Sequence, residues 1–206
     1  MFISILFINM FLNKPFILAS SSKSRFNILK KSGIPFSVVK PKCNEDYIKA
    51  KLKKINTKPK NIAKALSLEK AMSVSCLKKN YLVVGCDTVI VFENKLIDKA
   101  KTVEEAKKKL IKLSGKDHKI ISAVTVCLNS KSVWSHQEST TITMKKLNPK
   151  QINNYLKRAG KQILSSVGCY QIENMGPQII KNIKGDFFNV MGLPLFSLLD
   201  YIESKK

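Results

Sequence analysis

Short apolar segments alternate along this chain with segments of helical pattern, and this alternation restricts the possible folds more than any other feature. The predicted strands span residues 16–19, 35–39, 81–86, 89–92, 119–128 and 133–144. The predicted helices span residues 23–32, 61–77, 102–115, 148–160 and 194–202. Because no linker rich in proline, glycine or serine interrupts the alternation, the sequence predicts one α/β domain.

Capping residues, proline and glycine indicate where two of the predicted helices begin or end. Thr102, followed three residues later by Glu105, predicts a capping box. Asn148 and Pro149 predict a capped helix start with proline in the first turn. Gly160 is expected to end that helix.

The charge of the chain is strongly positive. Its 206 residues are 44% hydrophobic, which is enough for a globular core, and the formal net charge is +23. Such a field attracts polyanions. However, Arg25 and Arg158 are the only arginines, and nucleic-acid readers rely on arginine for bidentate contacts. The lysines are spread along the chain, which favours solvated faces over a dedicated nucleic-acid surface.

The cysteines and histidines lack the spacing of a metal site. Five cysteines form no CxxC pair, which excludes a simple zinc ribbon and argues against a disulfide framework. Cys86 and Cys127 lie in apolar runs and are predicted to be core residues. His118 and His136 are interpreted as structural or exposed residues. We therefore expect a reduced protein located in the cytoplasm.

The first residues of the chain are almost wholly apolar. Residues 1–12 lack a basic segment and a small-residue cleavage site, and they are too few to span a bilayer. We interpret residues 1–12 as an N-terminal extension and residues 13–206 as the domain. No other stretch approaches a membrane-spanning segment, so no membrane partner is expected.

The first candidate for chemistry is the segment of residues 19–25. A strand that leads through hydroxyl residues into a helix start points backbone N–H groups at one place, where phosphate binds readily. Ser20 and Ser22 belong to this turn, and Arg25 lies one turn into the helix. The alternative is a serine cap followed by surface charges. The spacing of a Walker A loop is absent.

The second candidate is Asp87, at the end of the apolar run of residues 81–84. A carboxylate there either holds a divalent ion, acts as a base towards water, or caps a turn. If the following strands pair around residues 93–95, Lys99 returns near Asp87, although in so basic a chain an ordinary lysine is the preferred interpretation without other support. Glu45 is a further candidate metal ligand or a surface acid.

Five motifs occur in a fixed order: residues 17–22 with Arg25, 85–89, Lys99, 113–118 and 185–195. They resemble the patterns ILAS-x-S-x-R-R, G-A-D-T-V, G-K-P, L-S-G-R-x-H and G-D-Y-x-N-V-x-G-L-P-L of the Maf family of nucleotide pyrophosphatases, also called septum formation inhibitor Maf-like proteins. The resemblance covers roughly residues 15 to 202. Five ordered motifs are far more specific than any single one.

The resemblance implies a mixed, twisted sheet flanked by helices with a nucleotide cleft, as in the Maf/ITPase-like fold. It implies hydrolysis of nucleoside triphosphates to the monophosphate and pyrophosphate with a divalent cation, Mg²⁺ or Mn²⁺, and a homodimer. By matching position, Asp87 is the proton acceptor for water, and Glu45 and Asp87 place the metal. The residues that would hold the triphosphate are Ser20, Ser22, Arg25, Lys70 and Lys99.

Three positions bear on which base is preferred. Ser24 stands where the family has the first arginine of its pair. Glu173 resembles the branch that acts on 7-methyl-GTP, whereas Thr88 resembles the branch that acts on thymidine and uridine triphosphates. Glutamate only accepts hydrogen bonds, whereas glutamine also donates them. Base preference therefore stays open, with a 7-methyl-GTP pyrophosphatase as the alternative.

Two other classes of function compete with this one. The first is a nucleotide-binding regulator of cell division that does not depend on catalysis. The second is a nucleic-acid-binding protein driven by the +23 charge, which predicts steeply salt-dependent affinity. Scattered lysines and few aromatic residues make this last class the weakest, so no specific nucleic-acid partner is expected.

Overall fold

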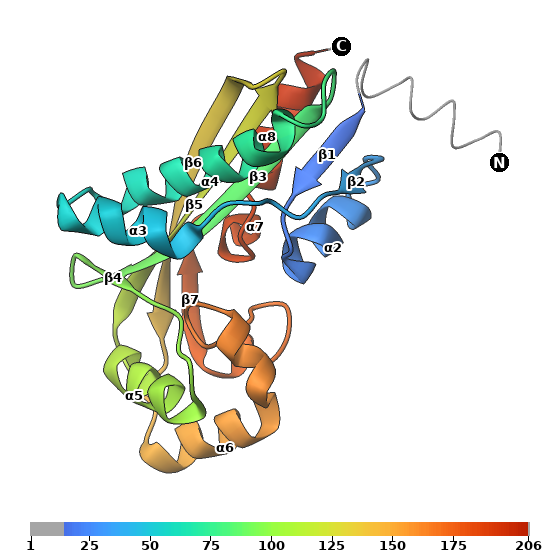
Figure 1. Cartoon of the computed structure of the whole chain (residues 1–206). Helices are drawn as coiled ribbons and strands as arrows, with labels where there is room; N and C mark the ends of the chain where they lie inside the picture. Colours follow the sequence, from blue (N-terminus) through green and yellow to red (C-terminus); the bar gives the residue numbers. More distant parts are fainter. Residues whose placement is uncertain (1–14, 206) are drawn as a thin grey trace. The chain divides into compact units, whose positions relative to one another are not determined.

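The computed structural model of the protein describes residues 15–205, in which seven strands form one sheet flanked by seven α-helices (Figure 1). The strands are β1 (Phe16–Ala19), β2 (Ser37–Val38), β3 (Leu82–Phe92), β4 (Lys95–Ile97), β5 (Asp117–Leu128), β6 (Lys131–Met144) and β7 (Ile180–Lys184). The helices are α2 (Lys23–Lys31), α3 (Glu45–Lys54), α4 (Pro59–Ser75), α5 (Val103–Leu113), α6 (Pro149–Ala159), α7 (Phe187–Val190) and α8 (Leu195–Glu203). The extension predicted over residues 1–12 lies outside the described residues.

The sheet is mixed. Its strand order is β2-β1-β3-β5-β6-β7, with β4 paired to β3. Strand β1 runs parallel to β2 and to β3, while β3–β4 and β6–β7 are antiparallel pairs. The predicted α/β fold with a mixed sheet and flanking helices is therefore confirmed.

The described chain divides into two compact units. The first unit contains residues 15–88, 122–138 and 192–205, and the second contains residues 89–121 and 139–191. Strands β3, β5 and β6 contribute residues to both units. Each unit has a cluster of buried apolar residues of its own.

In the first unit, a small cluster joins β1, β3, β5 and α4. Its buried members are Ile17, Ala19, Ala71, Val74, Val83 and Cys127. Cys86 and Cys127 are fully buried, which confirms their predicted place in the core. Elsewhere in this unit, the ring of Tyr201 in α8 stacks on the ring of Trp134 in β6, with centroids 4.8 Å apart.

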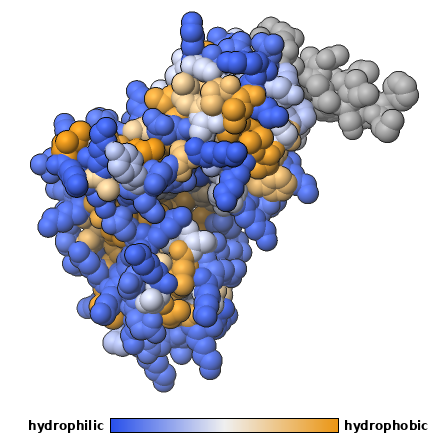
Figure 2. Space-filling view, viewed as in Figure 1, coloured by the Kyte–Doolittle hydropathy of each residue, from blue (hydrophilic) through white to orange (hydrophobic). Residues whose placement is uncertain are grey.

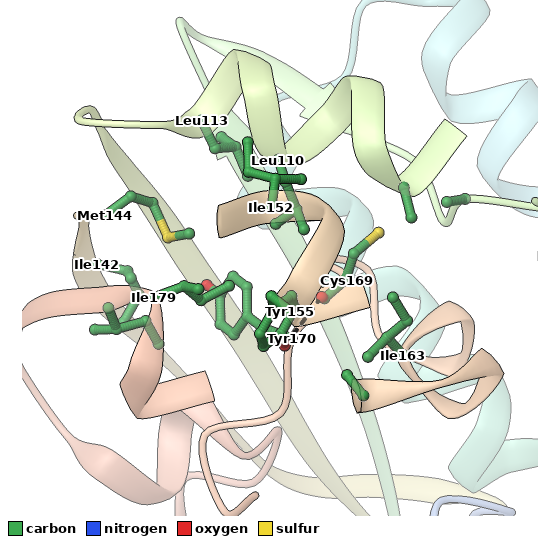
Figure 3. Packing of buried hydrophobic residues seen from close by; sticks show 14 of the residues in the cluster. Leu110, Leu113, Ile142, Met144, Ile152, Tyr155, Ile163, Cys169, Tyr170 and Ile179 are labelled. Carbon is green, nitrogen blue, oxygen red and sulfur yellow. Dashed lines mark hydrogen bonds between the residues drawn. The ribbon is translucent and has the colours of Figure 1, made fainter. Parts of the chain in front are cut away.

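In the second unit, helices α5 and α6 pack on a larger cluster. Figure 3 shows side chains from both helices meeting those of β6 and of the segment between α6 and β7. The labelled members are Leu110, Leu113, Ile142, Met144, Ile152, Tyr155, Ile163, Cys169, Tyr170 and Ile179. The two helices, predicted from their capping residues, each bury one apolar face.

Helix α4 lies directly on β3 because Gly85 has no side chain. A Cβ atom at Gly85 would lie 2.2 Å from the carbonyl oxygen of Ser67 and 2.5 Å from the backbone nitrogen of Ala71. Next to this contact, the hydroxyl oxygens of Ser67 and Thr125 are 2.8 Å apart, which ties α4 to β5 as well. The helix axis is thereby fixed over the strand that contains Asp87 (Figure 1).

The predicted helix caps are largely confirmed. Asn148 and Gln151 form a reciprocal capping box at the start of α6, and Gly160 is its C-cap with φ +66°. At α5 the hydroxyl of Thr102 accepts a bond from the backbone N–H of Glu105, as expected. The Glu105 carboxylate, however, accepts from the N–H of Lys101 instead of that of Thr102, so the capping-box prediction is only half right.

The structure also contains elements that the sequence did not predict, namely α3, α7 and β7. Helix α3 has no buried residue, and its apolar spacing is limited to a short pattern that includes Ile48 and Leu52. Strand β3 is continuous through residues 82–92, so Asp87 lies within a strand and not at its end. The predicted hairpin after β3 is present, with Glu93 and Asn94 at positive φ in its turn.

The surface is mainly hydrophilic, as the composition predicts. Figure 2 shows hydrophilic residues over most of the visible face, with apolar patches between them. Over residues 15–205, no helix combines the length and the apolar character needed to cross a membrane.

Candidate active site

The turn between β1 and α2 is built from serine hydroxyl groups. The hydroxyl of Ser22 caps α2 by accepting a bond from the N–H of Arg25, at 3.4 Å. The hydroxyl of Ser20, which is buried, accepts from the N–H of Ser22 at 3.1 Å. The serine-cap interpretation is therefore right for Ser22, and the same turn places several N–H groups at the positive end of a helix.

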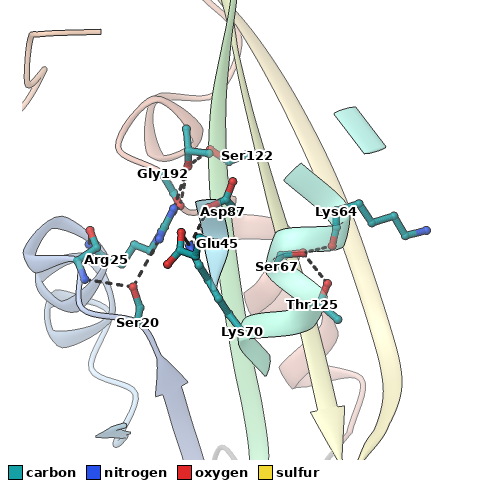
Figure 4. Close-up of polar contacts among 12 residues, drawn as sticks. Ser20, Arg25, Glu45, Lys64, Ser67, Lys70, Asp87, Ser122, Thr125 and Gly192 are labelled. Carbon is teal, nitrogen blue, oxygen red and sulfur yellow. Dashed lines mark hydrogen bonds and ion pairs between the residues drawn. The ribbon is translucent and has the colours of Figure 1, made fainter. Parts of the chain in front are cut away.

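Arg25 is a buried cation that joins three parts of the first unit. Its Nε donates to the carbonyl oxygen of Gly192 at 2.7 Å, and Nη2 donates to the hydroxyl of Thr88 at 3.0 Å. Nη1 lies 3.5 Å from the hydroxyl of Ser20. Figure 4 shows the side chain extending from α2 towards these partners. A guanidinium has five N–H donors, so these three contacts are compatible with an additional contact to phosphate.

The hydroxyl of Thr88 is shared between Arg25 and Ser122. The Thr88 and Ser122 hydroxyl oxygens are 2.9 Å apart, and Ser122 is completely buried in β5. Sequence reasoning missed Ser122, and it gave Gly192 no role although it quoted the motif around it. The available signal for Ser122 was a hydroxyl residue inside an apolar strand, since buried polar groups need partners.

The structure brings three predicted residues, Lys70, Asp87 and Glu45, into one ionic cluster. The ammonium nitrogen of Lys70 lies 2.7 Å from Asp87 Oδ1 and 2.7 Å from Glu45 Oε2 (Figure 4). The side chains of Lys70 and Asp87 are 7% and 11% exposed, whereas that of Glu45 is 48% exposed. Glu45 reaches the cluster because it is the first residue of α3, which packs against α4.

This cluster also excludes one of the three interpretations of Asp87, that of a residue that caps a turn. Asp87 lies inside β3 and forms a buried ion pair, so it is not a residue that caps a turn. A buried carboxylate is costly unless it is paired, and Lys70 supplies the pairing charge. The arrangement keeps the carboxylate of Asp87 beside the ammonium of Lys70.

The donor set at this cluster suits a hard divalent cation. Asp87 and Glu45 offer carboxylate oxygens that already converge on one cationic nitrogen. Within residues 15–205 no group of three or more histidine, cysteine, aspartate or glutamate side chains is placed to hold a metal ion. Two carboxylates fit Mg²⁺, which usually keeps several waters and takes phosphate oxygens as further ligands.

The two cysteines near the cluster are not activated thiols. Burial raises the pKa of Cys86 to about 11. Burial also raises the pKa of Cys43, and the nearby carboxylate of Glu45 raises it further. Both groups are therefore neutral at physiological pH and add no anionic ligand to the site.

The remaining predicted site residues are Ser24, Lys99 and Glu173. Ser24 is half-buried in the first turn of α2, in the first unit. Lys99 and Glu173 are exposed and belong to the second unit, Lys99 just after β4 and Glu173 in the segment before β7. Their roles in substrate binding stay predictions.

His118, which belongs to one of the five motifs, is a structural residue of the second unit. Its ring is buried, and Nε2 shares a hydrogen bond with the hydroxyl of Tyr170. Nδ1 has no hydrogen-bond partner within residues 15–205. Loss of hydration on burial lowers the pKa of His118 to about 4, so the ring is neutral near pH 7. The structural interpretation of this histidine is confirmed.

Comparison with known proteins gives consistent matches over nearly the whole chain. The sequence profile of the family described as Maf-like protein matches residues 15–205. The chain is 39% identical over 189 residues to a nucleoside triphosphate pyrophosphatase of Caulobacter vibrioides, covering 92% of this chain and 94% of the relative. It is 36% identical to a 7-methyl-GTP pyrophosphatase of Brucella abortus (92% and 96% covered). It is 39% identical to another of that name from Bartonella quintana (89% and 91% covered).

Proposed function

Since this chain belongs to the Maf family, we propose that it is a nucleoside triphosphate pyrophosphatase, a hydrolase that converts nucleoside triphosphates to the monophosphate and pyrophosphate. The observation that supports this most directly is the cluster of Lys70, Asp87 and Glu45 in the same unit as the serine turn and Arg25. It combines a carboxylate able to accept a proton with cationic groups that suit phosphates.

In the proposed reaction, Asp87 accepts a proton from the water that attacks the α-phosphorus. A bond forms between the water oxygen and this phosphorus, and the bond from phosphorus to the oxygen bridging the α and β phosphates breaks. Pyrophosphate leaves with that oxygen. Because Oδ1 of Asp87 accepts a bond from Lys70, we assign the other carboxylate oxygen to the water.

The triphosphate would bind at the start of α2. The N–H groups of this turn and the hydroxyls of Ser20 and Ser22 lie at the electropositive start of the helix. Arg25 adds a charge that is already held in place by three neutral oxygen acceptors, so little reorganisation is needed on binding. Lys70 and Lys99 are proposed to complete the set of phosphate contacts.

We propose that Glu45 and Asp87 hold the divalent cation, Mg²⁺ or Mn²⁺, that the reaction needs. When bound, such an ion neutralises charge on the phosphates and fixes their orientation. The support in this chain is the convergence of the two carboxylates and the hard oxygen character of both ligands.

The substrate's base is proposed to be read by Glu173, with Ser24 and Thr88 as further determinants. A carboxylate accepts two N–H bonds, which suits the edge of a guanine. Two of the relatives described above are named 7-methyl-GTP pyrophosphatases, so this narrower activity is the second candidate. Thr88 is committed to Arg25 and Ser122, so any effect of Thr88 on specificity would act through the position of Arg25.

The test is pyrophosphate release from a panel of nucleoside triphosphates, with and without Mg²⁺ or Mn²⁺. The panel contains the standard ribo- and deoxynucleotides, 7-methyl-GTP and 5-methyl-UTP. We expect metal-dependent release, reduced roughly a hundredfold to ten-thousandfold in Asp87→Asn. Asp46→Asn, which alters an exposed carboxylate of α3, is the matched control and should retain full activity.

The same panel separates the candidates. A change in the order of preferred bases in Glu173→Gln would assign base recognition to this residue, whereas an unchanged order would remove it from that role. If the folded wild-type protein released no pyrophosphate from any nucleotide, the enzymatic proposal would be wrong. In that case nucleotide binding without catalysis, as in a regulator of cell division, would be tested next. The homodimer and the cytoplasmic location stay predictions.

A further inference from the structure

The ammonium group of Lys70 occupies a position that two carboxylates share. It is equidistant, at 2.7 Å, from one oxygen of Asp87 and one oxygen of Glu45. These are the carboxylates that we propose as ligands of the divalent cation. A lysine and a metal ion therefore have the same preferred place in this site, and both cannot fill it together.

Elementary electrostatics makes the two cations competitors. Two converging carboxylates favour a positive charge between them, and at such distances in a partly buried site the attraction is strong. Mg²⁺ requires oxygen ligands at about 2.0–2.1 Å, so the ion can bind these oxygens only after the ammonium has left them. Resting on the proposed function, we propose that Lys70 is the built-in counter-ion of Asp87 and Glu45, which excludes a divalent cation until nucleotide phosphates draw its ammonium away.

The surrounding structure allows this exchange without moving the backbone. Contact with Gly85 and the bond between Ser67 and Thr125 hold α4 on the sheet, so the backbone of Lys70 is fixed. Its four-carbon side chain is flexible, and its ammonium is a compact charge that donates to phosphate oxygens as readily as to carboxylate oxygens. The Glu45 side chain is half exposed, so it can exchange its partner for a hydrated ion at the mouth of the site.

Competition between Lys70 and the divalent cation sets the order in which the cation and the triphosphate bind. The free protein would have low affinity for a divalent cation by itself. The cation would enter together with the triphosphate, because the phosphates both bind the cation and compensate the ammonium released from the carboxylates. Lys70 would thereby change partners between the free and the substrate-bound protein, from Asp87 and Glu45 to phosphate.

The test is binding of Mn²⁺ alone to the full chain without nucleotide, measured by the electron paramagnetic resonance signal of free Mn²⁺. We expect weak binding by the wild type and binding at least about tenfold tighter by Lys70→Met, since the variant loses the competing charge. Lys64→Met, on the same helix but exposed, is the matched control and should bind Mn²⁺ as weakly as the wild type. Adding Glu45→Gln to Lys70→Met should remove the gain.

Equal or weaker Mn²⁺ binding by a folded Lys70→Met variant would overturn the proposal. Circular dichroism checks folding, and Lys70→Gln, which keeps a polar group near the carboxylates, replaces the methionine variant if that variant does not fold. Mn²⁺ binding is measured without nucleotide and does not depend on catalytic turnover. Pyrophosphate release by the wild type, assayed separately, therefore shows whether a negative result concerns Lys70 or the enzymatic activity itself.

Discussion

Arg25 and Lys70 are both buried cations, but the chain pairs them with different partners. Arg25 donates to a carbonyl and to hydroxyl groups, which are neutral, so its charge is not cancelled. Lys70 faces two carboxylates, and its charge is more than compensated. Before substrate arrives, the attraction for a triphosphate at this site therefore comes from Arg25 and the start of α2, and not from Lys70.

At His118, a single ring makes folding stability depend on pH. Burial lowers its pKa to about 4, from an ordinary value of 6.5, so the unfolded chain binds a proton more readily than the folded protein. Stability is therefore full above about pH 6.5 and falls as the pH drops towards 4. The shift corresponds to a loss of roughly 3 kcal/mol in the free energy of unfolding.

Urea unfolding at pH 7 and at pH 4 measures this loss, with His118→Gln as the comparison. The glutamine keeps a polar group near Tyr170 but does not titrate in this range. The variant should be less stable at pH 7 and should lose clearly less stability on acidification, because the buried ring that takes up a proton on unfolding is absent. An equal loss in both proteins would mean that His118 is not the titrating group.

Among the elements, the contact between α4 and β3 depends on one glycine. In Gly85→Ala the new methyl group would meet backbone atoms of α4 at Ser67 and Ala71, which cannot turn aside as a side chain can. The helix must move away from the strand, and with it Lys70. We expect a loss of about 1–3 kcal/mol in the free energy of unfolding, together with reduced pyrophosphate release.

Gly33→Ala is the matched control for this change. A Cβ atom at Gly33 meets nothing within 4 Å, but the residue has φ +76°, so alanine there costs about 1–2 kcal/mol of backbone strain. Urea unfolding should thus show a loss in both variants, whereas pyrophosphate release should fall only in Gly85→Ala. Normal activity in Gly85→Ala would contradict the proposed dependence of the site on the α4–β3 contact.

How well each element could be predicted from the sequence depended on whether its pattern is local. Helices α5 and α6 have a buried apolar face and capping residues, and both were predicted. Helix α3 has only a short apolar pattern, in which Ile48 and Leu52 lie four residues apart, and none of its residues is buried, so it was missed although it supplies Glu45. Such a short apolar pattern is a weak signal for a helix.

For the residues of the site, prediction likewise depended on whether their pattern is local in the sequence. Asp87 and Arg25 were found because each belongs to a motif with a recognisable local order. The partner of Arg25 at Gly192 is a backbone carbonyl, and every residue has one, so the sequence could not single it out. Ser122 meets Thr88 only because two strands lie next to each other in the sheet. Convergence of Lys70, Asp87 and Glu45 likewise required the fold.

For the whole molecule, the +23 charge predicts that anionic substrates are captured faster at low salt. Raising the ionic strength from roughly 0.01 M to about 0.15 M shortens the screening length from about 30 Å to about 8 Å. We expect kcat/KM for a nucleoside triphosphate to fall by about tenfold over this range, with kcat nearly constant. Steady-state pyrophosphate release in potassium chloride measures both, and a kcat/KM independent of salt would mean that scattered lysines do not steer the substrate.

The hydrogen bond between Arg25 and Gly192 joins residues separated by most of the chain. During synthesis, the serine turn and α2 leave the ribosome early, but the carbonyl that anchors Arg25 is made only near the end. Until then, a growing chain exposes the guanidinium of Arg25 without that partner. The phosphate-binding half of the site is therefore incomplete in any chain that has not yet been synthesised past Gly192.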